Sequence, residues 1–100
     1  MRYAYSAIFT PEDGGVYSVH FPDLPGCVTC GDDMPDAVIM AQDALCLWLY
    51  DLEQDNRLIP KASNPKDMQA GAGGFTSVVA VDTNVYRRFY EKLDAAKQAI

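Results

Sequence analysis

Hydrophobic and polar residues alternate with a period of two along the first part of the chain, which is typical of half-buried β-strands. Residues 3–10 and 16–21 both alternate in this way, and the turn-forming residues 11–15 lie between them. A third, shorter apolar run follows at 27–31. These segments predict an antiparallel meander of three strands.

The spacing of apolar residues changes to three and four after residue 33, which indicates an amphipathic helix of about five turns. Asp33 is suited to cap this helix, Pro35 stands in its first turn, and the polar residues 55–57 end it. The predicted core-facing stripe consists of Met34, Ala37, Val38, Ala41, Leu45, Trp48 and Leu52.

The pattern after this helix predicts a long loop, one more strand and a second helix. Residues 59–74 contain Pro, Asn and Gly without any period, which is typical of an exposed loop. Residues 75–81 are β-branched and apolar and predict a fourth strand buried on both faces, and a less hydrophobic helix is expected at about 84–100. We therefore expect one α+β domain over residues 1–100, with its core in residues 3–82 and the order β-β-β-α-β-α.

The net charge of the chain indicates which kinds of partner it can bind. Eight Lys and Arg residues stand against 14 Asp and Glu residues, which gives a formal net charge of −6. Binding to nucleic acid depends on clustered Lys and Arg, so this balance argues against that task and suits a basic partner. The sequence has no apolar run of signal-peptide or transmembrane length and an odd number of cysteines, three, so we expect a cytoplasmic protein without a membrane segment or a disulfide framework.

Metal and redox chemistry are tested first on Cys27 and Cys30, which form a C-x-x-C motif. A structural zinc site needs four ligands, and two thiols three residues apart on a strand point to opposite faces. His20, the single histidine, alternates with apolar neighbours and is expected on the outer face of its strand. We therefore predict no metal, no cofactor and no catalytic residue at these positions.

Three carboxylates near one another in sequence, Asp23, Asp32 and Asp33, leave a magnesium-dependent nuclease as an alternative. The favoured interpretation is structural, because Asp23 stands in a turn and Asp33 caps the helix. The sequence therefore predicts a protein that is not an enzyme.

The face of the long helix opposite the core stripe is also apolar, which suggests that something covers it. Two covers stay open: a second copy of the chain, giving a homodimer or higher homo-oligomer, or the second helix through Phe89, Tyr90 and Leu93. The apolar residues of this face are Ile39, Met40, Cys46, Leu47 and Tyr50, and we predict self-association through Ile39, Met40, Leu47 and Tyr50.

The stretch 17–44 carries a recognisable motif. Residues 21–27 read F-P-D-L-P-G-C, a short strand closes on Gly31 and Asp32, and the segment 58–60, L-I-P, leads out of the helix. Pro22 and Pro25 fix φ in a tight turn, and a glycine follows them. In these features the sequence resembles the HicB-like antitoxin domain.

This resemblance implies a partial ribonuclease-H-like fold without a nuclease site. It implies that the domain neutralises a small, basic, HicA-like toxin that cleaves mRNA, and the candidate toxin-facing residues are Asp23, Asp32 and Asp33. Such antitoxins often carry a C-terminal DNA-binding module, whereas a single helix is expected after residue 84, which argues against DNA binding. The alternative is an orphan relative that binds RNA directly.

Overall fold

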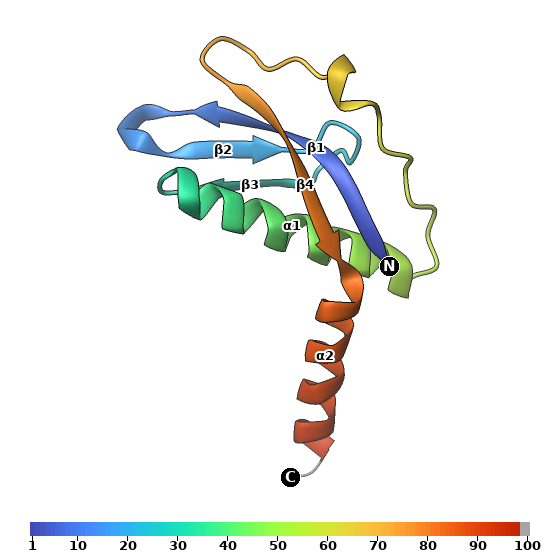
Figure 1. Ribbon diagram of the computed structural model, residues 1–100. Coiled ribbons are helices and arrows are strands. Elements are labelled where there is room, and N and C mark those ends of the chain that lie inside the picture. Colours follow the sequence, from blue (N-terminus) through green and yellow to red (C-terminus); the bar gives the residue numbers. More distant parts are fainter. Residues whose placement is uncertain (99–100) are drawn as a thin grey trace.

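The computed structural model describes residues 1–98 of the 100-residue chain, with only the backbone described at positions 94, 97 and 98. It is an α+β structure in which one long helix lies on an antiparallel sheet and a second helix extends from it (Figure 1). In chain order the elements are β1 (Arg2–Pro11), β2 (Tyr17–His20), β3 (Val28–Gly31), α1 (Met34–Gln54), β4 (Phe75–Asp82) and α2 (Thr83–Gln98), with short 3₁₀ turns η1 (Asp13–Gly15) and η2 (Pro65–Asp67).

The sheet has the order β3-β2-β1-β4, and every neighbouring pair is antiparallel. The predicted three-stranded meander is confirmed, because β1 pairs with β2 and β2 pairs with β3. The fourth strand pairs with β1 over eight positions, from Arg2 opposite Asp82 to Phe9 opposite Phe75. β1 is therefore a central strand, and β3 and β4 are the two edges.

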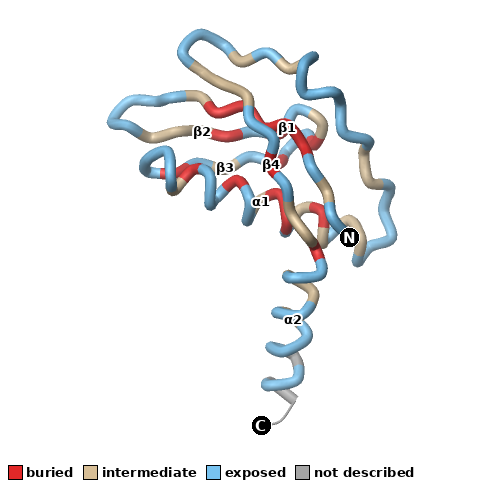
Figure 2. Tube along the Cα trace, in the orientation of Figure 1, coloured by how far each residue is buried: buried red, intermediate tan, exposed pale blue. Residues whose placement is uncertain are grey.

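The core lies between α1 and one face of the sheet (Figure 2). Phe9 of β1 and Leu45 of the predicted stripe are at most 1% exposed and lie in this core, as expected. Leu49 is also fully buried although it was not assigned to the stripe, and Ser6 and Ile8 on the other face of β1 are buried as well. The prediction that Met34 and Val38 belong to the core-facing stripe is wrong, because these residues in the first turns of α1 are 39% and 42% exposed. They lie where the short strand β3 is the edge of the sheet, so less of the sheet faces them.

The F-P-D-L-P-G-C segment forms two consecutive turns. The Leu24 N–H donates to the Phe21 carbonyl at 3.0 Å, and the Cys27 N–H donates to the Leu24 carbonyl at 2.9 Å. Gly26 has a φ of +95° at the third position of the second turn, which a side chain rarely tolerates, and Trp48 lies directly against it. The three residues that bound the turns are at most 3% exposed, so this local motif also builds the core.

The prediction that β4 is buried on both faces is wrong. Val79 is buried, whereas Val78 is 50% exposed and Ala80 is exposed. The physical reason is its place at the edge of the sheet, where α1 covers one face only. The apolar, β-branched composition of residues 75–81 is shared by central and edge strands and does not separate them.

The predicted long connection between α1 and β4 is confirmed as mostly exposed, and it contains the 3₁₀ turn η2 and a hydrogen-bonded turn at residues 71–74. It is nevertheless attached to the domain. The Tyr5 hydroxyl donates to the Pro60 carbonyl, and Ser63 donates its N–H and its hydroxyl to the Asp23 carboxylate at 2.8 and 2.6 Å.

The second helix begins at Thr83, one residue before the expected start, and projects away from the sheet (Figure 1). The expected end at Ile100 lies outside the described residues. Within residues 1–98, neither helix is long and apolar enough to span a bilayer.

Candidate protein-binding surface

One end of the sheet gathers carboxylates from two separate connections. Pro11, Tyr17 and Gly31 are paired at the same level of β1, β2 and β3. The turn after β1 and the link from β3 to α1 therefore leave the sheet at the same end, as Figure 1 shows. We call this surface the acidic end, and it consists of Glu12, Asp13, Asp32, Asp33 and Asp36.

Local hydrogen bonds hold part of the acidic end in place. The Asp33 carboxylate accepts from the Asp36 N–H at 2.9 Å and caps α1, as predicted, and the Asp36 carboxylate accepts from the Asp32 N–H at 2.9 Å. These carboxylates sit at a helix N-terminus, where the helix dipole favours negative charge. Gly31 makes the arrangement possible, because a Cβ at this position would lie 2.3 Å from the backbone nitrogen of Ala37.

The acidic end belongs to a longer anionic part of the chain. Residues 3–56 contain ten Asp and Glu residues and no Lys or Arg. Of the eight basic residues, Arg2 lies at the start of β1, and the other seven follow the end of α1. No cation within this segment neutralises the carboxylates at the acidic end. The surface is therefore suited to a basic partner.

The structure separates the three aspartates predicted to face a partner. Asp23 follows the end of β2 where His20 pairs with Val28, whereas Asp32 and Asp33 follow the opposite end of the β2–β3 pair. Both oxygens of Asp23 accept from Ser63, so this carboxylate holds the long connection. The three carboxylates are near one another in sequence but not in the structure, so they do not form the cluster that a magnesium site would need.

Cys27 and Cys30 differ in exposure, as expected, and His20 is on the outer face of its strand. Cys27 is 3% exposed in the core, and burial raises the pKa of its thiol to about 11. Cys30 and His20 are exposed. Within the described part of the chain, no three His, Cys, Asp or Glu side chains gather closely enough to hold a metal ion.

The outer face of α1 is partly covered. Ile39, Met40 and Leu47 are 57%, 37% and 40% exposed, whereas Tyr50 stacks on Tyr90 of α2 with ring centroids 5.4 Å apart. The sequence left two alternatives for covering this face, the second helix or a second copy of the chain. In the structure α2 covers the C-terminal part of the face, and the part around Ile39, Met40 and Leu47 stays exposed.

Cys46 was expected on this outer face and is instead only 6% exposed. The reason is the junction between β4 and α2, which lies against that flank of α1. The Cys46 thiol is 3.6 Å from the Asp82 carbonyl oxygen, and burial and neighbouring carboxylates raise its pKa.

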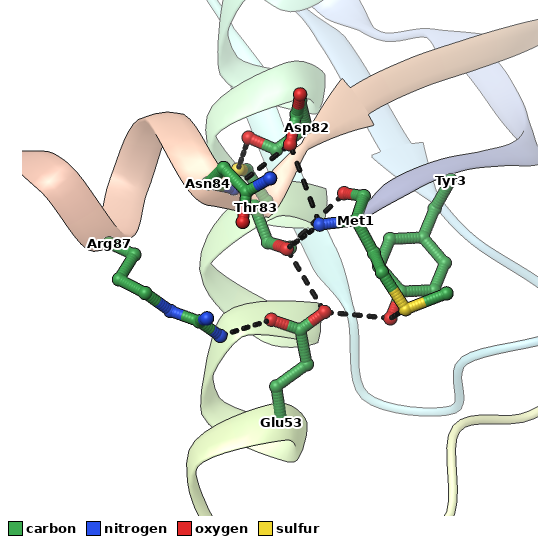
Figure 3. Close-up of polar contacts among 8 residues, drawn as sticks. Met1, Tyr3, Glu53, Asp82, Thr83, Asn84 and Arg87 are labelled. Carbon is green, nitrogen blue, oxygen red and sulfur yellow. Dashed lines mark hydrogen bonds and ion pairs between the residues drawn. The ribbon is translucent and has the colours of Figure 1, made fainter.

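A polar cluster centred on Glu53 joins α1, β1 and α2 (Figure 3). The Glu53 carboxylate accepts from the Tyr3 hydroxyl at 2.7 Å, from the Thr83 hydroxyl at 3.0 Å and from the Arg87 guanidinium at 3.2 Å. Burial and the hydrogen bond to Glu53 raise the pKa of Tyr3 to about 12. This cluster fixes the start of α2 against the domain, and its groups are engaged with one another.

Sequence reasoning missed three members of the acidic end, Glu12, Asp13 and Asp36. The signal that identifies the first two was present, because a meander of three strands brings the first turn and the end of the third strand to the same edge. The predicted topology, together with the positions of the carboxylates, therefore places Glu12 and Asp13 near Asp32 and Asp33.

A four-stranded antiparallel sheet covered on one face by one helix, with an anionic end, defines a small acidic α+β domain. The model of the HicB_like antitoxin of bacterial toxin-antitoxin systems matches residues 5–97. The chain belongs to this family.

Curated relatives agree with this assignment. A UPF0150 protein of Thermoplasma acidophilum is 35% identical over 57 residues, which cover 57% of this chain and 83% of that protein. Antitoxin HicB of Escherichia coli is 37% identical over 59 residues, which cover 59% of this chain and 43% of that protein. The match thus spans less than half the length of the E. coli antitoxin.

Solved structures share the fold. A toxin-antitoxin complex from Streptococcus pneumoniae contains a chain that superposes with a TM-score of 0.78 at 24% identity, covering 86% of this chain and 73% of that one. The N-terminal domain of antitoxin HicB from Burkholderia pseudomallei gives a TM-score of 0.70 at 25% identity, covering 80% of this chain and 99% of that one. The expected antitoxin-domain fold is confirmed by these superpositions.

Proposed function

We propose that this chain is a non-catalytic, cytoplasmic antitoxin that binds a small, basic, HicA-like toxin and thereby neutralises it. The observation that carries the proposal is the acidic end, a concentration of carboxylates without cations on a domain of an antitoxin family. Solved relatives described as toxin-antitoxin complexes support the same role. The ribonuclease-H-like relationship of the fold stays a prediction.

Within this proposal, Asp32 and Asp33 face the toxin together with the neighbouring Glu12 and Asp13. An anionic surface speeds the encounter with a basic protein and orients it, and this effect weakens as salt is added. Asp23, at the other end of the β2–β3 pair, keeps a structural role through Ser63. A cationic toxin whose RNA-binding surface meets these carboxylates has its substrate excluded.

The test begins with co-expression of the chain with the product of the adjacent open reading frame, if that frame encodes a small basic protein. We expect a stable complex on gel filtration and relief of the growth arrest that the toxin causes. The absence of a complex at micromolar concentration would contradict the proposal. Binding of RNA at low salt, in place of the toxin, would favour the alternative of an orphan RNA-binding relative.

Matched charge variants then test the surface. Asp13→Asn combined with Asp32→Asn removes two charges at the acidic end, and within the described part of the chain neither side chain makes a hydrogen bond. Asp51→Asn combined with Asp55→Asn removes two charges at the other end of α1. We expect the first pair to lower the association rate constant about tenfold at low salt and the control pair much less. Equal effects of the two pairs would show that net charge, and not this surface, controls association.

A further inference from the structure

The second helix presents an apolar stripe that the rest of the described structure leaves exposed. Val85, Phe89 and Leu93 follow one another at intervals of four residues, so they lie on one face of α2, and they are 65%, 57% and 40% exposed. Val85 and Phe89, together with Tyr86 and Tyr90, line a shallow apolar groove of about 310 Å³. α2 projects from the domain (Figure 1), so this stripe lies on a helix that extends beyond the sheet.

Contacts with the rest of the chain hold only the first half of α2. Tyr86 and Tyr90 lie against Tyr50, and Arg87 pairs with Glu53 at 3.2 Å. An isolated helix of this length is marginal in water, and most helical stability in proteins comes from packing of an apolar face. The apolar face of α2 therefore has no packing partner among the described residues.

A complementary patch lies on the same molecule. Ile39, Met40 and Leu47 leave apolar surface exposed on the outer face of α1, and the exposed Asp43 stands among them. The stripe on α2 has the opposite charge at its border, where Arg88 and Lys92 are exposed. Both patches are apolar, and their charges are complementary, because one carries a carboxylate and the other carries two cations.

We propose that α2 of one copy packs across the outer face of α1 of a second copy, with the same contact made in the reverse direction. The two patches cannot meet within one chain, because α2 leaves the domain beside Tyr50 and extends away from the exposed part of α1 (Figure 1). A reciprocal exchange between two copies satisfies both patches in each copy and closes a two-fold dimer. This contact uses none of the carboxylates of the acidic end, so it does not rest on the proposed function.

The oligomeric state of the isolated chain tests the proposal directly. We expect sedimentation equilibrium at about 100 μM to give twice the mass of one chain. Phe89→Glu should weaken the dimer at least about thirtyfold, because it places a charge at the centre of the apolar contact. Val78→Glu is the matched control, since Val78 is 50% exposed on the sheet and lies outside both patches. A monomeric wild-type chain, or an unchanged dimer in Phe89→Glu, would overturn the proposal.

Charge reversal identifies what α2 contacts. Arg88→Glu with Lys92→Glu should weaken the dimer, Asp43→Lys alone should weaken it, and the three changes together should restore most of the lost affinity. Circular dichroism of each variant shows whether the fold is kept, and Leu47→Glu replaces any variant that unfolds. If Asp43→Lys and Leu47→Glu both leave the dimer intact while Phe89→Glu dissociates it, α2 binds another surface and the proposed exchange is wrong.

Discussion

The contact between Gly31 and α1 supports a quantitative prediction. A Cβ added at Gly31 would lie 2.3 Å from the nitrogen and 2.5 Å from the Cα of Ala37, and both are backbone atoms of a residue that is fully buried. Neither atom can move by a change of rotamer, so α1 has to shift away from β3 by about 1 Å to restore normal contact distances. We expect Gly31→Ala to lower the free energy of unfolding by about 2–4 kcal/mol.

Urea unfolding followed by circular dichroism measures this loss. For a domain of this size the urea m-value is about 1–1.5 kcal/mol/M, so the midpoint should fall by roughly 2 M with an unchanged slope. Gly71→Ala is the control, because a Cβ at Gly71 meets nothing within 4 Å and its change should stay within about 0.5 kcal/mol. Equal midpoints for the two variants would refute the steric reasoning.

Three further predictions concern single side chains. Burial and Glu53 raise the pKa of Tyr3 to about 12, so between about pH 10 and pH 12 the folded state keeps the hydroxyl proton that the unfolded chain loses. The free energy of unfolding should therefore fall over this pH range, and it should fall less in Tyr3→Phe. Urea titrations at several pH values across the range measure both. Iodoacetamide should modify Cys30 rapidly in the native protein and the buried Cys27 and Cys46 only after unfolding, and mass spectrometry of the peptides would expose any other order. Asp33→Ala should cost about 1 kcal/mol by removing the cap of α1, whereas Asp32→Ala should change the thermal midpoint little, and equal shifts would contradict the assigned roles.

Features determined by neighbouring residues were predictable from the sequence. The cap at Asp33 and tight turns through Pro22 and Pro25 depend on local geometry alone, and the structure confirms both. Cys27 and Cys30 also differ in exposure as expected, although Cys27 lies just before β3 and not on it. The alternation of β1 identified Tyr5, Ala7 and Phe9 as core residues for the same reason, but it did not predict the burial of Ser6 and Ile8 on the other face.

Features determined by distant pairing were not predictable in this way. Whether β4 is central or at an edge depends on its partner, and the apolar composition of residues 75–81 is compatible with either position. The burial of Cys46 depends on the β4–α2 junction, and the separation of Asp23 from Asp32 depends on the direction of β3. Each of these errors concerns tertiary placement, whereas the type of every helix and strand was predicted correctly.

The pairing of the central strand with the last one has a consequence for how the chain folds. Every β1–β4 pair joins residues between 66 and 80 positions apart, and the Thr83 N–H donates to the Met1 carbonyl at 3.0 Å. Such long loops are costly to close, so this half of the sheet should form last. During synthesis the first three strands and α1 leave the ribosome with one side of β1 unpaired, a state open to proteases and to misplaced strands. The interval before residue 82 emerges is therefore when the domain is most vulnerable.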